Sequence, residues 1–393
     1  MPETETNPND ANASERKGNQ PPPHAAVVVE SAFEVRTSPA CSELISDQER
    51  LGKLLPVIAK NQRVAADTEA DSLHCYREKL CLLQISIPEG DFLVDPLAEN
   101  DLVPLARLLA NRELVLHGAD YDLRLLRRGL NFQPGRLFDT MIAARLLGVR
   151  EFSYAAMVEK YFGVQLTKGS QKANWALRPL SPKMEEYARN DTHYLLPLAE
   201  RLERELLERN RLDWLRQSCA RLIDISATDR ERDGEEAWRV RGAGLMHGLE
   251  AAILRALWHW RDAEAQRADR PAFHILRNDQ LIQAAQTAAT GGHPKFRHLS
   301  TRRARGFEDA IEEARALAEE SWPQLHKRRG PRPTPEMLRA SDALRKQRDA
   351  AATKLGMEPS FIAPRAAIDL IAADRSRAES LLVPWQRELL GLE

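Results

Sequence analysis

The stretch Arg63-Val-Ala-Ala-Asp-Thr-Glu-Ala-Asp71 decides the fold, because it places two carboxylates two residues apart at the end of a short β-type run. Successive side chains of a strand point to opposite faces, so Asp67 and Glu69 share one face. Two acids on one sheet face repel each other, and burial disfavours their ionisation unless a cation is present. Mg²⁺ or Mn²⁺ would resolve the conflict, since both take carboxylate oxygens and keep positions for further oxygen ligands. The alternative is a surface turn in which Asp67, Glu69 and Asp71 are solvated.

The length and composition indicate a soluble chain with several domains. The 393 residues suffice for two or three domains, and the hydrophobic fraction of 43% and charged fraction of 29% are ordinary for soluble proteins. No apolar run approaches the roughly 20 residues of a membrane span. The polar N-terminal residues show no basic region followed by an apolar one, so no secretion signal is expected. We therefore expect a cytoplasmic protein. With a net charge of −1, any affinity for nucleic acid must come from local basic patches or bound metal.

The four cysteines exclude two classes of stabilising site. Cys41, Cys75, Cys81 and Cys219 show no Cys-x-x-Cys spacing. We therefore expect neither a zinc site nor a disulfide framework, and the thiols should be reduced and partly buried.

Changes in composition along the chain predict its domains. Residues 1–31 are rich in Asn, Pro, Glu and Ser and poor in large apolar side chains, which predicts a disordered tail. Residues 32–227 alternate β-type and helical patterns, which predicts an α/β domain with a mixed sheet. A charge run at 228–236 and a basic, proline-rich run at 326–335 predict linkers. They border two segments with helical patterns, residues 238–322 and 336–393.

Individual elements follow from the apolar periodicity. In the helical stretch 249–260, the residues Leu249, Ile253, Leu257 and Trp260 share one face. In the α/β part, residues 64–66, 80–87, 92–94 and 114–117 are predicted as strands, and residues 102–109 and 123–130 as helices.

Two aspartates near the start of the helix that follows Gly118 differ in their expected surroundings. Asp120 lies four residues before Arg124, so it should lie on the solvent face or cap the helix. Asp122 lies four residues before Leu126 and should face the sheet, where an unpaired carboxylate is costly. Asp122 is therefore a third candidate metal ligand.

A later helix carries the fourth acid. The sequence predicts that this helix begins here, because Ser181 suits the N-cap and Pro182 suits the first helical position. Its apolar stripe contains Tyr187 and Asp191 one turn apart, among Met184, Ala188, Leu195 and Leu198. Such a pair is either a buried Tyr-Asp hydrogen bond or part of a site.

Together these residues resemble the DEDD superfamily of 3′-5′ exonucleases, tyrosine subclass. The motifs are Asp-Thr-Glu at 67–69, His-Gly-Ala-Asp-Tyr-Asp at 117–122 and Tyr-Ala-Arg-Asn-Asp at 187–191, in the order of that family. Relatives with histidine in the third motif place it five residues before the last Asp, where this chain has Glu186. Further runs, including Lys-Leu-Cys-Leu-Leu-Gln-Ile-Ser and Asn-Trp-Ala-Leu-Arg-Pro-Leu, look like the ribonuclease D family in particular.

The resemblance extends into the helical half. Ala-Leu-Trp-His-Trp-Arg-Asp-Ala-Glu-Ala and Arg-Pro-Ala-Phe-His-Ile-Leu-Arg-Asn-Asp-Gln-Leu, within residues 238–322, are similar to the HRDC domain. Residues 336–393 look like a second, shorter HRDC-type region, with a plain helical cap on the first module as the alternative. The implied architecture is a ribonuclease H-like α/β domain followed by all-α HRDC-type domains.

The resemblance also implies a mechanism. Asp67, Glu69, Asp122 and Asp191 would hold two Mg²⁺ or Mn²⁺ ions roughly 4 Å apart, which activate water and stabilise the leaving 3′ oxygen. Tyr187 would orient the attacking water, because a phenol is a poor base near neutral pH. The products would be nucleoside 5′-monophosphates released from the 3′ end of RNA such as tRNA precursors.

The loop at 166–175 is expected to bind substrate. Lys168, Gln171 and Lys172 offer phosphate contacts, and Trp175 offers a stacking surface, unless Trp175 packs under the loop. His117 is left out, since a histidine at a strand end is more often structural. Two other functions stay open: a DNA exonuclease of the Werner type, and a nucleic-acid-binding scaffold with an inactive site.

Overall fold

The computed structural model describes residues 44–167, 169–228, 236–324 and 333–393. The predicted tail at 1–31 and Cys41 lie outside these ranges, as do most residues of the two predicted linkers. The remaining cysteines, Cys75, Cys81 and Cys219, are free and buried, as expected. Across the described residues, no helix combines the length and the apolar character that crossing a membrane requires.

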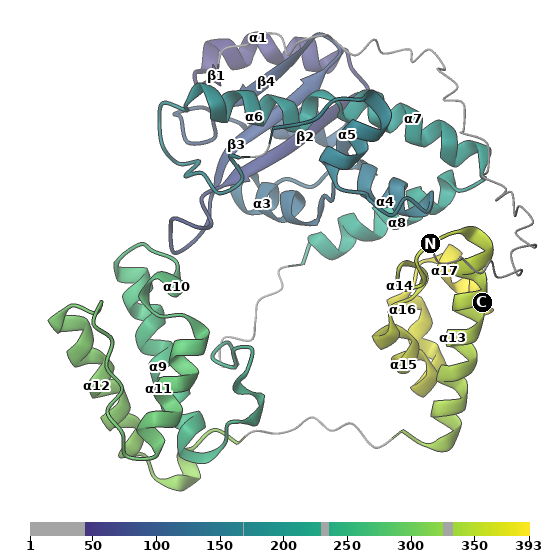
Figure 1. The fold of residues 1–393 in the computed structure, drawn as a ribbon. Helices are drawn as coiled ribbons and strands as arrows, with labels where there is room; N and C mark the ends of the chain where they lie inside the picture. Colours follow the sequence, from purple (N-terminus) through teal and green to yellow (C-terminus); the bar gives the residue numbers. More distant parts are fainter. Residues whose placement is uncertain (1–43, 168, 229–235, 325–332) are drawn as a thin grey trace, which may run out of the picture. The chain divides into compact units, whose positions relative to one another are not determined.

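A six-stranded mixed sheet forms the centre of the α/β part (Figure 1). Its strand order is β1-β4-β3-β2-β5-β6. Strand β3 runs antiparallel to both β2 and β4, whereas the pairs β1-β4, β2-β5 and β5-β6 are parallel. The strands are β1 Leu44–Ile45, β2 Arg63–Ala70, β3 Leu80–Ile87, β4 Gly90–Val94, β5 Glu113–Leu116 and β6 Arg136–Asp139. The predicted mixed sheet is confirmed.

Helices flank this sheet and connect its strands. Helix α6 contacts β2, β3 and β4, α7 contacts β2, β3 and β5, and α8 contacts β6. The helices are α1 Gln48–Ala59, α2 Val103–Ala110, α3 Asp120–Leu130, α4 Thr140–Leu146, α5 Tyr154–Phe162, α6 Pro182–His193, α7 Leu195–Glu208 and α8 Leu212–Ser226. The side chain of Ser181 accepts a hydrogen bond from the Met184 backbone N–H, so α6 begins where its N-cap predicts.

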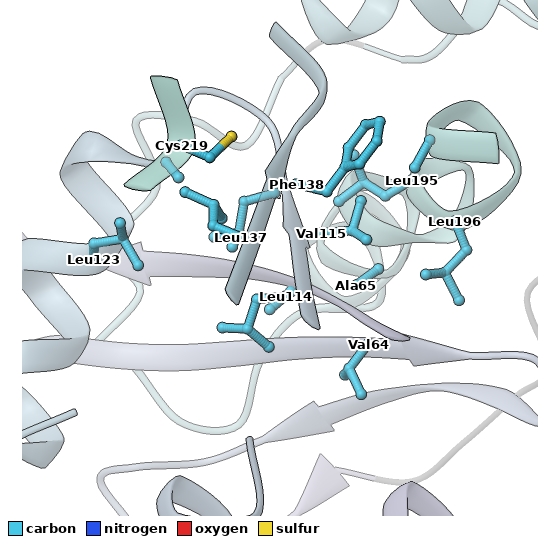
Figure 2. Close-up of a cluster of buried hydrophobic side chains, with 14 of the residues drawn as sticks. Val64, Ala65, Leu114, Val115, Leu123, Leu137, Phe138, Leu195, Leu196 and Cys219 are labelled. Atoms are coloured by element: carbon cyan, nitrogen blue, oxygen red, sulfur yellow. The ribbon is translucent and has the colours of Figure 1, made fainter. Parts of the chain in front are cut away.

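The core of the α/β part lies between the sheet and these helices. Every residue of β3 is buried, as expected of a central strand covered on both faces. Figure 2 shows apolar side chains of β2, β5 and β6 packed with residues of α3, α7 and α8. The labelled residues are Val64, Ala65, Leu114, Val115, Leu123, Leu137, Phe138, Leu195, Leu196 and Cys219.

The predicted elements match with shifted ends. Strand β3 has the predicted bounds, but β2 continues beyond the predicted 64–66 because Asp67, Thr68 and Glu69 pair with β3. The helix predicted from residue 123 begins at Asp120. Strands β1 and β6 were not predicted.

The two remaining segments are helical, as predicted. In the first, Ile253 and Leu257 are buried in an apolar cluster with Phe307, and Leu249 and Trp260 pack against it. Its helices are α9 Gly248–Arg267, α10 Ala272–Ile275, α11 Asn278–Ala289 and α12 Thr301–Arg315. The second contains α13 Pro335–Leu355, α14 Pro359–Ile362, α15 Arg365–Ala373, α16 Ala378–Leu381 and α17 Pro384–Leu389.

Candidate active site

Three of the predicted acids meet between the sheet and α6. Asp67 and Glu69 lie on β2, and Asp191 lies near the end of α6. One carboxylate oxygen from each lies within 4.8 Å of the other two. The solvated-turn alternative for this stretch is wrong, because residues 63–70 form a sheet strand. Asp71, just after the strand, is buried and accepts a hydrogen bond from the Lys79 backbone N–H at 3.0 Å while pairing with the Lys79 ammonium.

Asp122 reaches the same strand from α3. Its side chain is 7% exposed, and its Oδ1 accepts a hydrogen bond from the Thr68 hydroxyl at 2.5 Å. The charge of Asp122 raises the pKa values of Asp67, Glu69 and Asp191, so Asp122 lies near the three-acid group without belonging to it. Asp120 instead pairs with Arg124 at 2.9 Å, and its side chain is 46% exposed. The predicted contrast between these two aspartates is therefore visible in their surroundings.

The pKa values of these carboxyl groups are raised. Burial is the largest cause, and the neighbouring carboxylates add to it. The pKa of Glu69 rises to about 9, that of Asp191 to about 7 and that of Asp122 to about 6. The pKa of Asp67 lies well above its usual range, through burial and the charges of Asp122, Asp191 and Glu69. Without a cation these carboxyl groups resist ionisation, and a bound cation would favour their charged form.

Tyr187 points its hydroxyl at the acid cluster. The phenol forms a side-chain hydrogen bond with Asp191, one turn further along α6, which lowers the pKa of Asp191 against the effect of burial. Burial and the carboxylates Asp191, Glu69 and Asp67 raise the pKa of the phenol above its usual value. Tyr187 therefore stays protonated at neutral pH and is able to donate a hydrogen bond.

The predicted substrate loop is only partly available to a substrate. Trp175 is 0% exposed and packs with Leu82, Leu93 and Ala188, so the prediction of a stacking surface is wrong and the alternative, packing under the loop, holds. Gln171 forms a side-chain hydrogen bond with the Tyr187 phenol. Lys172 is exposed, and Lys168 lies outside the described residues.

An ion pair anchors the end of this loop. Arg178 binds Asp95 through two hydrogen bonds of 2.6 Å and also donates to the carbonyl oxygens of Trp175 and Cys81. A bidentate pair of this kind fixes orientation as well as position. The ring of Trp175 then lies 6.2 Å from that of Tyr187, measured between centroids, so the anchored loop supports the tyrosine.

Sequence reasoning missed Asp139. This fully buried residue ends β6, and its carboxylate accepts hydrogen bonds from the backbone N–H groups of Gly118, Ala119, Met141 and Ile142 at 2.8–3.1 Å. It thereby joins the start of α3, which carries Asp122, to the start of α4. An aspartate directly before a helical run is an N-cap signal that could have identified it. His117 contacts the Thr140 hydroxyl through Nδ1 at 2.9 Å, in keeping with the structural role expected of it.

Comparisons with known proteins agree with this arrangement. A family model described as 3′-5′ exonuclease matches residues 42–207, and one described as HRDC domain matches residues 250–290. Ribonuclease D of Zymomonas mobilis is 34% identical over 308 residues, which cover 73% of this chain and 76% of that protein. Ribonuclease D of Sphingobium indicum is 31% identical over 367 residues, covering 88% and 92%. The fold is similar to that of Escherichia coli RNase D, with a TM-score of 0.67 and 24% identity over 89% of this chain and 96% of that one.

Proposed function

The chain belongs to the ribonuclease D family and is a 3′-5′ exoribonuclease, and from this premise we propose that it trims structured RNA, such as tRNA precursors, by two-metal-ion hydrolysis. The observation that carries the mechanism is the group formed by Asp67, Glu69 and Asp191, whose oxygens lie within 4.8 Å of one another. We assign catalytic roles to these three acids, to Asp122 and to Tyr187.

The donor set fits a hard divalent cation. All the contributing atoms are carboxylate oxygens, which Mg²⁺ and Mn²⁺ prefer, and the pKa of each acid is raised. Asp67, Glu69 and Asp191 would hold the cations together with Asp122. Bound divalent cations supply the activation of water and the stabilisation of negative charge on the phosphate oxygens and the leaving 3′ oxygen.

Tyr187 would position the attacking water without removing a proton from it. The pKa of the phenol is raised, so the group is not a base at neutral pH, and its hydroxyl is held beside Asp191. Gln171 would keep the phenol in this orientation, in place of the phosphate contact predicted for it. Exposed Lys172 is left as the phosphate contact within the described part of the loop, and we retain Lys168 for the same role.

The substrate and location are parts of the proposal. Escherichia coli RNase D is described as an exoribonuclease involved in structured RNA processing, and the HRDC match at 250–290 gives this chain a second module with which to hold such RNA. We propose that residues 32–227 form the catalytic domain, 238–322 the HRDC-type domain and 336–393 a second HRDC-like region. The free, buried thiols of Cys75, Cys81 and Cys219 suit a reducing compartment such as the cytoplasm.

A degradation assay on the full chain tests the proposal. RNA and DNA oligonucleotides of one sequence, labelled at the 5′ end, would be incubated with Mg²⁺, Mn²⁺ or EDTA. We expect RNA to shorten stepwise from its 3′ end with either metal and to stay intact in EDTA. Preferred cleavage of DNA would favour the Werner-type alternative, and no cleavage of either would favour an inactive scaffold.

The two aspartates of α3 give this assay a matched pair of variants. Asp122→Ala should abolish cleavage, because Asp122 lies beside the acid cluster, whereas Asp120→Ala should leave the rate nearly unchanged, because Asp120 forms an exposed ion pair. The reverse order of rates would remove Asp122 from the site.

A further inference from the structure

Gln84 lies beside the acid cluster without any role in the mechanism above. It occupies the middle of β3, where it pairs with Asp67 of β2 on one side and with Leu93 of β4 on the other. Residues directly opposite each other in antiparallel strands have their side chains on the same face, with Cβ atoms about 5 Å apart. The Gln84 amide therefore projects on the Asp67 side of the sheet.

The same face of β3 is covered by α6. Two residues before Gln84, Leu82 packs in one cluster with Ala188 of α6. Two residues after it, the Ser86 hydroxyl forms a hydrogen bond of 2.7 Å with the Thr192 hydroxyl of α6. Gln84 thus stands between two side chains that touch α6, in the layer that also contains Asp191. It is 0% exposed, so it is not a contact for RNA.

The amide of Gln84 has no hydrogen-bond partner within the described residues. Both its Nε2 and its Oε1 are buried and unpaired. The other polar side chain of β3 differs, since Ser86 bonds both Asp91 and Thr192. Burying an unpaired amide destabilises a protein, and methionine would fill the same space without that cost. The structure therefore holds a free donor next to Asp67 at the expense of stability.

We propose that Gln84 is a positioning residue of the metal site, whose Nε2–H would donate to the Asp67 carboxylate when a divalent cation is bound. This inference rests on the proposed function. A carboxylate ligand keeps lone pairs that need donors, and such outer partners orient the ligand. A neutral amide suits this task beside a cluster of acids, because it orients Asp67 without supplying the positive charge that would compete with the metal.

Binding of Mn²⁺ tests the inference without reference to activity. The full-length protein, stripped with EDTA, would be titrated with Mn²⁺ while free Mn²⁺ is measured by electron paramagnetic resonance. Gln84→Met should weaken binding by about tenfold or more, the range found for outer-shell changes. Leu93→Met changes the neighbouring buried position on the same face and should leave the affinity unchanged.

Thermal unfolding in EDTA supplies the second readout. Because the amide is unpaired in the metal-free protein, Gln84→Met should unfold at the same temperature as the wild type or at a higher one. Equal Mn²⁺ affinities of Gln84→Met and the wild type would overturn the inference. Gln84→Leu is the second variant, and failure of both to fold would also overturn it, since the metal-free fold would then need the amide. Failure of the wild type itself to bind Mn²⁺ would instead refute the proposed metal site.

Discussion

The buried Glu264 and the partly buried acid cluster formed by Asp67, Glu69 and Asp191 have opposite surroundings. Glu264 of α9, which is 5% exposed, accepts hydrogen bonds from Arg302 at 2.6 and 2.7 Å and from Arg303 at 3.2 Å, and it also pairs with Arg267. The Arg302 hydrogen bonds are the largest cause of a pKa lowered to about 2. In the cluster on β2 and α6, burial and then the charges of Asp191 and Asp122 raise the pKa of Glu69 to about 9.

The difference separates a structural acid from a functional one. The helical segment neutralises Glu264 with its own arginines, so that carboxylate already has its cations. The acids of the sheet repel one another in the metal-free protein, which lowers stability and favours the binding of external cations. The tests below change one of these two environments and leave the other intact.

Asp67→Asn should have the largest effect on activity. It replaces a charged metal ligand of the cluster with a neutral amide and so weakens metal binding. The cleavage rate at saturating Mg²⁺ should therefore fall at least on the order of a thousandfold. The metal-free variant should be as stable as the wild type or more so, because repulsion is relieved. Single-turnover RNA cleavage and thermal unfolding in EDTA measure the two effects. Near-normal turnover would contradict the proposed metal site. A lower unfolding temperature in EDTA would contradict the proposed repulsion between the clustered carboxylates.

Tyr187→Phe should have a smaller effect. Loss of one hydroxyl that positions water should lower the maximal rate by roughly 10- to 1000-fold and spare RNA affinity. Tyr161→Phe is the matched control, because the Tyr161 phenol donates to Glu205 at 2.7 Å in another part of the α/β fold. Weakened RNA binding with the rate preserved would show Tyr187 to be a substrate contact.

The sequence predicted the elements that hold the acids better than the loop around them. The prediction that Asp67 and Glu69 share one face follows from the alternation of side chains along a strand. The prediction that Asp122 shares a face with Leu126 follows from the period of the α-helix. Both are local rules, and the structure follows both. The contacts of Trp175 depend on residues of β3, β4 and α6 far along the chain, so periodicity carries no information about them.

Asp139 and Gln84 show a second reason for missed residues. Asp139 stabilises backbone N–H groups that come from two separate helix starts, and this sharing is a product of the sheet order. Gln84 stands in a run of buried residues, and strand pairing determines its neighbour Asp67. Long-range register of this kind is not encoded in any short stretch of sequence.

The raised pKa of Glu69 predicts a measurable pH dependence. Between its unfolded value of about 4.5 and its folded value of about 9, the folded protein binds more protons than the unfolded one, so stability in EDTA should fall as the pH rises. The slope is at most about 1.4 kcal/mol per pH unit for each extra proton. Urea unfolding at pH 6, 7, 8 and 9 measures it. Glu69→Gln should flatten the slope, and an unchanged slope would show that the pKa of Glu69 is not raised.

Glu264→Gln tests the other side of the comparison and should have the smallest effect. The pKa of Glu264 is lowered, so its contribution to stability is present above the unfolded value of about 4.5 and is lost as the pH falls toward about 2. At neutral pH the change should destabilise the helical segment by about 1–2 kcal/mol, because Arg302 and Arg267 are partly solvated and their attraction is screened.

The readouts for Glu264→Gln are the unfolding transition of the full chain and the cleavage of a short single-stranded RNA. Glu308→Gln on α12 removes the same charge at an exposed position and should leave both unchanged. Because Glu264 lies outside the 3′-5′ exonuclease match, its loss should spare the cleavage rate while lowering stability. A rate that falls with Glu264→Gln but not with Glu308→Gln would mean that this arginine-paired acid also supports catalysis, and the division between structural and functional acids would then fail.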